Sequence, residues 1–472
     1  MSAPVAATES TPPLRMIGGA AGALAPPLVF VGILFWLSVE ERATISGFWV
    51  GGLAALVVGL VLAREKQRYA ESVVTGLADR TGAMIVVAFI FAGIFGKLMA
   101  AGGLVDGLLW VGLETGLGGA AFTCLAFVLA SVFGLGTGTS VGTVTALVPV
   151  LYPAGVLLGA DPVMVALAVL AGGAFGDNLA PVSDTTIASA FTQGARMGDV
   201  VRQRAPLALA AAAIALAVFA IFGGGGDATG DLSAIGADPS PLGLVMLLPF
   251  ALVIVLAMAG RHILEALIWG SVSAIVLGVI TGLLTLPQVF SPPAERGEST
   301  GLIEDGVRGV TGPVILVLLV LAMAQVLADS GLMAKMLQGL QARAARGVRS
   351  AELIIIGVGI LFTIPLGANA PAILMIGPTI AKPLGEAYGL APARRANLLD
   401  ASVCTIFYTL PWHNAVIVWF GVVLAASTEL GVEPPSIWSA ALNPYAWGLL
   451  LVIIVSALTG WNRTYSTKEP TA

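Results

Sequence analysis

Two carboxylates and several hydroxyls interrupt a long apolar region of the chain in the stretch Gly176-Asp177-Asn178-Leu179-Ala180-Pro181-Val182-Ser183-Asp184-Thr185-Thr186. The residues before and after this stretch are almost all uncharged, as in segments buried in a lipid bilayer. Carboxylates at membrane depth cost free energy, and they commonly mark ion pathways or proton relays. The stretch therefore predicts both a membrane-embedded fold and a functional site.

The composition supports a membrane protein. Of 472 residues, 57% are hydrophobic and only 10% are charged, and the mean hydropathy is +0.97; a soluble domain is far less apolar. The net charge of −5 is spread over loops and argues against a nucleic-acid partner. Cys124 and Cys404 lie far apart in apolar segments without metal-ligand spacing. With no ATP-binding, haem or metal-cluster pattern, we expect no cofactor.

Uncharged runs repeatedly reach the length of about 20 residues that a helix needs to cross a bilayer. Two of them, 115–160 and 353–381, are long enough for two segments each. The sequence thus predicts an all-α integral membrane protein with 12 to 14 transmembrane segments. The runs are 16–39, 43–63, 81–96, 115–160, 205–226, 239–260, 266–294, 309–328, 353–381, 401–428 and 434–461. The first is interpreted as a retained helix and not a signal peptide, because it is long and lacks a small-residue cleavage site.

Basic residues between the runs predict the orientation, because short cytoplasmic loops retain Lys and Arg. With the N-terminus inside, 17 basic residues fall in inner loops, among them Arg204, Arg394 and Arg395, and only 3 fall outside. Both termini are therefore expected in the cytoplasm and the protein in the cytoplasmic membrane.

An internal repeat divides the chain into two halves. Residues 97–104 align with 325–332, 133–149 with 362–378, and 181–184 with 411–414, at offsets of 228, 229 and 230. The predicted orientation makes the halves antiparallel, as in transporters built from inverted repeats. The expected organisation is a disordered cytoplasmic N-terminus (1–15), a first repeat (16–223), an external linker (224–240), a second repeat (241–461) and a disordered cytoplasmic tail (462–472). Residues 335–349 are expected to form a basic amphipathic helix on the cytoplasmic face.

Small and polar residues interrupt the apolar runs at matched places in both halves, 134–142 and 176–184 in the first and 367–371 and 411–414 in the second. Unwound backbone survives in a membrane only where it is buried in protein or lines a wet cavity. Helices broken near the midplane would turn backbone oxygens and helix ends toward a bound ion. A small hard cation prefers an oxygen shell, and the interruptions supply candidates: Asp177, Asn178, Ser183, Asp184, Thr185, Thr139, Ser140, Asn369 and Asn414.

The stretch 176–186 resembles the signature of the NhaC family of sodium/proton antiporters, within the ion transporter superfamily. The Gly-rich break at 136–143 and the pair Pro411-Trp412 resemble two further elements of that family. The resemblance extends from about residue 82 to residue 419. It implies exchange of Na⁺ or Li⁺ for H⁺, with monovalent cations and protons as substrates. Two positions depart from the family pattern, Ala180 in place of a usual Ser and His413 in place of a common Asn, and they bear on ion selectivity.

The expected mechanism is competition between a proton and a cation at a buried carboxylate, combined with alternating access. Burial favours the protonated form until a cation displaces the proton. We assign Asp184 as the shared Na⁺ ligand and Asp177 as a second ligand, with Ser183, Thr185, Thr139, Ser140 and Asn369 as neutral oxygen donors. Either carboxylate could instead cap a helix that starts nearby.

Three further residues are secondary candidates. Lys97 could pair with a buried carboxylate, although its position near the end of a span favours snorkelling to the interface. Asp400 opens a later apolar run beside Arg394 and Arg395, which favours a helix-start cap. His413 titrates in the physiological range and could sense pH, but a neutral hydrogen-bonded histidine is the simpler interpretation.

Other functions remain open at this point. A Na⁺- or H⁺-coupled carrier of a small carboxylate or amino acid would be expected to place Arg or Lys at the site, and none interrupts the motifs. An intramembrane aspartyl protease also uses two buried aspartates, but Ala174 breaks its Gly-x-Gly-Asp motif. A channel could use similar oxygen-lined constrictions. The oligomeric state is open, and a homodimer is compatible with the sequence.

Overall fold

The protein is a bundle of helices, and the part of the chain that the structure describes contains no named strand. The computed structural model describes residues 13–39, 45–78, 80–180, 183–226, 239–259, 261–292, 299–332, 347–367 and 369–466. The first-half helices are α1 (Ala25–Val39), α2 (Ile45–Leu62), α3 (Lys66–Leu77), α4 (Arg80–Ala101), α5 (Leu104–Thr115), α6 (Gly119–Thr137), α7 (Ser140–Leu157), α8 (Pro162–Leu179), α9 (Asp184–Gln193) and α10 (Met197–Phe222).

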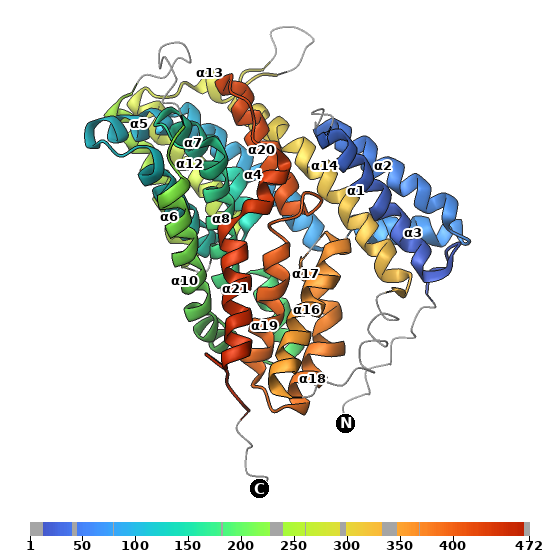
Figure 1. Cartoon of the computed structure of the whole chain (residues 1–472). Coiled ribbons are helices and arrows are strands. Elements are labelled where there is room, and N and C mark those ends of the chain that lie inside the picture. Colours follow the sequence, from blue (N-terminus) through green and yellow to red (C-terminus); the bar gives the residue numbers. More distant parts are fainter. Residues whose placement is uncertain are drawn as a thin grey trace, which may run out of the picture.

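The second half has a similar series of helices. They are α11 (Leu247–Met258), α12 (Ile263–Thr281), α13 (Leu286–Val289), α14 (Leu302–Asp329), α16 (Val348–Leu366), α17 (Asn369–Ile376), α18 (Lys382–Ala387), α19 (Pro392–Ile406), α20 (Asn414–Leu430) and α21 (Pro444–Thr459), with a π-helical turn at Gly377–Ala381. Figure 1 shows α1, α2 and α3 gathered with α14 at one edge of the molecule, while α16, α19 and α21 lie side by side in another part.

Many of these helices suit a bilayer. Seven helices in the described residues are long and apolar enough to cross a membrane, and α4 and α5 together pass the same test as a pair bent by 53°. Five shorter apolar helices accompany them. The all-α membrane fold expected from composition is confirmed, whereas the number of true crossings stays a prediction.

The interruptions predicted from sequence fall between helices. The helices that precede and follow the interruptions begin at residues 119, 140, 162 and 184 in the first half and at 348, 369, 392 and 414 in the second. Each first-half helix therefore has a counterpart that begins 229 or 230 residues later. Gly138 (φ 67°) and Gly367 (φ 63°) end α6 and α16 in the left-handed conformation that glycine adopts without strain. The helix order therefore repeats; the inverted relation of the two halves stays a prediction.

Several predicted segments lie partly or wholly outside the described residues: 1–12 of the N-terminus, 227–238 of the linker, 335–346 of the expected amphipathic helix and 467–472 of the tail. Where the termini are described, they make contacts with the helices. Leu14 is buried and its N–H donates to the Asp329 carbonyl at 2.7 Å. Residues 462–466 are held by hydrogen bonds between Gln203 and Thr464 (2.7 Å) and by a bridge between Leu390 and Tyr465.

Ion pairing also fixes the C-terminal segment. Glu352 of α16 is fully buried and accepts hydrogen bonds from Arg394 of α19 (2.8 Å) and from Arg463 (2.6 Å). These hydrogen bonds with Glu352 raise the pKa of the Arg463 guanidinium above its ordinary value. Arg394 and Arg395 are buried in α19 and do not lie in loops, where the sequence placed them. Glu352 neutralises Arg394, whereas Arg395 pairs with Glu386 and donates a hydrogen bond to the neutral Gln193 side chain.

Close backbone contact between α6 and α8 brings the first two interruptions together. A Cβ atom added at Gly176 would overlap the backbone of Gly134 and Leu135, and one at Gly172 would lie 2.6 Å from the Ala130 side chain. Small residues let helices approach in this way in membranes. Only glycine at position 176 allows α8 to reach the end of α6 where the break begins.

We predict that Gly176→Ala lowers the thermal unfolding midpoint of the purified protein, because overpacking a close contact costs about 1–3 kcal/mol. Gly357→Ala is the matched control: position 357 is also inside a helix, but a Cβ there meets nothing within 4 Å. Alanine should leave the midpoint at position 357 unchanged or slightly higher, since glycine weakens a helix interior. Equal midpoints for the two variants would contradict the close α6–α8 contact.

Candidate functional site

Asp177 lies near the end of α8 and accepts hydrogen bonds from three hydroxyl groups. Its Oδ2 accepts from Ser140 at 3.0 Å and from Tyr408 at 2.7 Å, and its Oδ1 accepts from Ser183 at 2.6 Å. Ser140 begins α7, Ser183 precedes α9, and Tyr408 belongs to the connection between α19 and α20. All four side chains are buried. The Asp177 carboxylate thus joins both first-half interruptions to one from the second half.

Further hydroxyl oxygens lie next to this cluster. The Ser183 and Thr185 hydroxyls lie 3.0 Å apart, and the Tyr408 and Ser140 hydroxyl oxygens also lie 3.0 Å apart. Thr139 accepts a hydrogen bond from the Gly142 N–H at 3.3 Å and so caps α7. A serine or threonine hydroxyl has one donor and two acceptor positions. The cluster therefore combines a carboxylate with hydroxyls that can rotate between donating and accepting.

A second buried cluster lies beside the first and centres on Arg204. Its guanidinium forms an ion pair with Asp400, donates to Asn397 Oδ1 at 2.9 Å and to Thr186 at 2.8 Å, and reaches the Asn178 carbonyl oxygen. Arg204 and Asp400 are fully buried. Arg204 therefore connects α10 to the end of α8, to α9 and to α19.

This geometry corrects two expectations. Asp400 lies inside α19, which begins at Pro392, so it does not cap a helix start; Pro392 occupies the first helical position instead. Arg204 is buried at the site and is not in a cytoplasmic loop. The expectation failed because a buried charge stays compatible with a membrane segment when an opposite charge neutralises it.

A chain of hydroxyls and one thiol connects the two clusters. Ser183 links Asp177 to Thr185, and Cys404 Sγ lies 3.9 Å from Thr185 Oγ1 and 3.2 Å from Asp400 Oδ1. Asn178 also lies between the clusters: its Oδ1 accepts from the Tyr445 hydroxyl at 3.2 Å, while its Nδ2 has no hydrogen-bond partner among the described residues. An unpaired buried amide is free to bind a water or a ligand.

Asn369 and Asn414 lie at the second-half interruptions. The Asn414 N–H donates to the Gly367 carbonyl at 3.1 Å, which brings the break after α16 to the start of α20. Asn414 Oδ1 is buried without a partner among the described residues, and Asn369 Oδ1 accepts from the adjacent Ala370 N–H at 2.9 Å. No hydrogen bond in the described part of the chain connects either asparagine to the Asp177 carboxylate.

The remaining candidates have other surroundings. His413 is fully buried, stacks on Phe407 with ring centroids 5.8 Å apart, and its Nε2 lies 3.4 Å from the Ile364 carbonyl oxygen. Lys97 forms an ion pair with Glu429, whose side chain is 64% exposed. Among the described residues, the ionic partner of Lys97 is therefore Glu429 and not Asp177. The side chain of Asp184, the first residue of α9, lies outside what the structure describes.

Tyr408, Tyr445, Asn397 and Cys404 belong to these clusters although the sequence did not single out any of them for the site. Tyr408 follows α19 by two residues in an uncharged run, and nothing local marks it. Arg204 had one signal, since it directly precedes the uncharged run 205–226. The described residues contain no group of three or more His, Cys, Asp or Glu side chains that could hold a metal ion.

We predict that Arg204→Gln strongly lowers the thermal unfolding midpoint, because it leaves Asp400 buried without its counter-ion, at a cost of about 3–5 kcal/mol. The double variant Arg204→Gln with Asp400→Asn should regain most of that loss, since no unpaired charge remains. Arg261→Gln is the control: its pair with Glu265 is exposed, and such pairs contribute about 0–1 kcal/mol. A double variant as unstable as Arg204→Gln alone would contradict the ion pair.

Known proteins with related sequences are antiporters. The chain is 26% identical over 260 residues to a malate-2H⁺/Na⁺-lactate antiporter of Bacillus subtilis, a match that covers 53% of this chain and 55% of that relative. It is 26% identical to the arginine/ornithine antiporter ArcD of Halobacterium salinarum, over 83% of this chain and 80% of the relative. It is 24% identical to the Na⁺/H⁺ antiporter NhaC of Alkalihalophilus pseudofirmus, over 74% and 78% respectively.

Two solved structures match this chain over most of its length at low identity and low TM-score. The YdaH transporter of Alcanivorax borkumensis matches 93% of this chain and 99% of its own, at 15% identity and a TM-score of 0.43. MtrF of Neisseria gonorrhoeae matches 93% and 94%, at 16% identity and a TM-score of 0.42. The model of the Na⁺/H⁺ antiporter family matches residues 7–224 and 240–459. The chain therefore belongs to the Na⁺/H⁺ antiporter family, whose members are membrane transporters and not enzymes.

Proposed function

We propose that this antiporter exchanges Na⁺ or Li⁺ for H⁺ across the cytoplasmic membrane, and that the two ions compete for Asp177. One observation carries the proposal: both oxygens of a buried carboxylate are held by hydroxyl groups from three separate helix interruptions. These groups form an oxygen-rich site of the kind that small hard cations prefer.

The hydroxyl groups can either donate hydrogen bonds or present their lone pairs, so they can adapt to the ionised, the Na⁺-bound and the protonated carboxyl group. When the carboxylate is ionised without a cation, Ser140, Ser183 and Tyr408 donate hydrogen bonds to it, as in this structure. When Na⁺ binds, the same hydroxyls rotate and turn lone pairs toward the cation. When a proton binds, the neutral carboxyl becomes a donor itself. Each state satisfies the buried polar groups, so proton and cation can replace one another at low cost.

Competition requires that the two ions never share the site. A proton on Asp177 removes the negative charge that attracts Na⁺, and a bound Na⁺ disfavours protonation through charge repulsion. Alternating access then exposes the occupied site to one side of the membrane at a time. The helix interruptions around Asp177 are the natural places for such movement, because they meet in one cluster and belong to both halves of the chain.

Asp184 enters the proposal as a second carboxylate ligand. The sequence favours it as the shared ligand, but the described contacts support Asp177 in that role. Asp184 begins α9 one residue after Ser183, whose hydroxyl is bound to Asp177. Thr185, Thr139 and Asn178 complete the set of neutral donors, and Asn369 and Asn414 would join it from the second-half interruptions. We place both termini in the cytoplasm, as the distribution of basic residues predicts.

A second candidate is the exchange of a small organic carboxylate or amino acid. Arg204 favours it, since a buried guanidinium beside the unpaired Asn178 Nδ2 is the group that a carboxylate substrate would need. Two relatives are named for malate and lactate and for arginine and ornithine. In this structure, however, Arg204 is already engaged by Asp400, Asn397 and Thr186. Its charge is therefore neutralised, which favours the inorganic cation.

We predict that Na⁺ or Li⁺ added to proteoliposomes drives proton movement, reported by an internal pH-sensitive dye, and that Asp177→Asn abolishes it. The amide cannot take up and release the proton that exchange requires. Asp161→Asn is the matched control: Asp161 caps the start of the same helix by accepting from the Met164 N–H at 2.8 Å, and asparagine caps equally well. Undiminished Na⁺- or Li⁺-driven proton movement in folded Asp177→Asn would contradict the proposal.

The same vesicles separate the two candidate functions. Labelled malate, lactate, arginine or ornithine is presented outside vesicles preloaded with the unlabelled solute, with and without Na⁺. The proposal predicts no uptake above that of protein-free vesicles. Uptake of one solute, together with no Na⁺-driven proton movement, would favour the organic carrier and assign Arg204 to substrate binding.

A further inference from the structure

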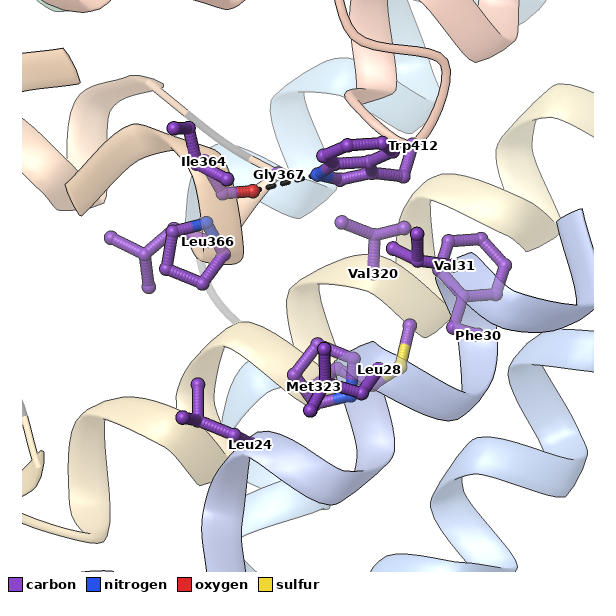
Figure 2. A pocket seen from close by; sticks show the side chains of 12 residues that line it. Leu24, Leu28, Phe30, Val31, Val320, Met323, Ile364, Leu366, Gly367 and Trp412 are labelled. Carbon is purple, nitrogen blue, oxygen red and sulfur yellow. Dashed lines mark hydrogen bonds between the residues drawn. The ribbon is translucent and has the colours of Figure 1, made fainter. Parts of the chain in front are cut away.

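A cavity of about 270 Å³ lies between α1, α14 and the end of α16. Figure 2 shows Val31 of α1 and Val320 of α14 below the Trp412 indole, with Ile364 and Leu366 of α16 across the view. The cavity also borders Gly367, where α16 ends and the second-half interruption begins. The cavity therefore lies between α1 and α14 and the joint between α16 and α17 at Gly367.

The wall of this cavity is almost wholly hydrocarbon. Its polar side-chain group is the Trp412 indole N–H, which already donates to the Ile364 carbonyl at 2.6 Å. Water needs two to four polar partners to occupy a cavity, whereas apolar cavities of about 150 Å³ stay dry and take up apolar molecules. The wall thus excludes ions and water and suits an alkyl chain.

The cavity is continuous with a surface that faces lipid. Leu28 lines it and is nevertheless 65% exposed, whereas Val320 and Leu366 on the inner wall are buried. The exposed apolar residues of α1, which include Phe35 and Trp36, mark this helix as lipid-facing in a membrane protein. The cavity therefore borders an exposed apolar surface at Leu28 of α1.

We propose that an acyl chain of a bilayer phospholipid occupies this cavity and contacts the joint at Gly367. Unfilled, the space would leave the side chains around it without packing partners, which is unfavourable in a folded protein. A flexible chain keeps these contacts and also adapts its shape when α16 and α17 move relative to α1 and α14. The proposal does not depend on which ion the protein exchanges.

Trp412 provides a direct test because its indole lines the cavity. The protein is reconstituted in phosphatidylcholine vesicles with or without bromine on the acyl chains, and the emission of Trp412 is taken as the difference between wild type and Trp412→Phe, since the chain has nine tryptophans. Brominated chains should quench about half of that emission or more, because they would lie in contact with the indole.

Cavity-filling variants distinguish a chain inside the cavity from lipid at the outer surface. Val320→Phe and, as an independent variant, Val31→Phe place a ring in the space and should each restore most of the lost Trp412 emission. Val272→Phe is the control, since Val272 lies on α12, away from the cavity, and is 43% exposed. Unquenched Trp412 in the wild type, or quenching that persists in both filled variants, would overturn the proposal.

Discussion

The burial of the Asp177 carboxylate is the constraint on which the rest of this structure depends. A charged or protonated carboxyl group inside a membrane protein must have its hydrogen-bonding positions satisfied. Here the partners come from the start of α7, the residue before α9 and the connection after α19. To bring them together, α6 and α8 approach so closely that position 176 admits only glycine. The helix interruptions are thus required by the site that they surround.

Arg204 and Asp400 extend this constraint to the surrounding helices. Their ion pair is buried, and Arg204 also donates hydrogen bonds to Asn178 at the end of α8 and to Thr186 in the first turn of α9. Removing one partner of such a pair is costly, which makes the pair a rigid frame and not a source of mobile charge. Because Arg204 and Asp400 neutralise each other, the exchangeable negative charge is that of Asp177. A fixed frame beside a carboxylate with rotating hydroxyls is a suitable arrangement for ion competition.

The membrane class and the positions of the interruptions could be predicted from the sequence. Hydropathy over long windows reports burial in lipid, and glycine and proline act on the backbone locally, so the breaks at Gly138 and Gly367 fall where the pattern indicates. The hydrogen-bond partners of Asp177 could not be predicted in this way. Tyr408 reaches it from 231 residues away, and no local pattern predicts that contact. Asp400 and Arg204 were misplaced because a charge usually marks the end of a span, and this marker fails when two buried charges neutralise each other.

Na⁺ binding to the purified protein shows whether one carboxylate, Asp177, binds either Na⁺ or a proton. Calorimetric titration at a series of pH values yields the apparent Kd without any need for transport. With competition at Asp177, the Kd should weaken about tenfold for each pH unit below the point at which the carboxyl takes up its proton, and Asp177→Asn should remove binding. A Kd that stays constant across this range, in protein that still exchanges Na⁺ for H⁺, would contradict competition at this site.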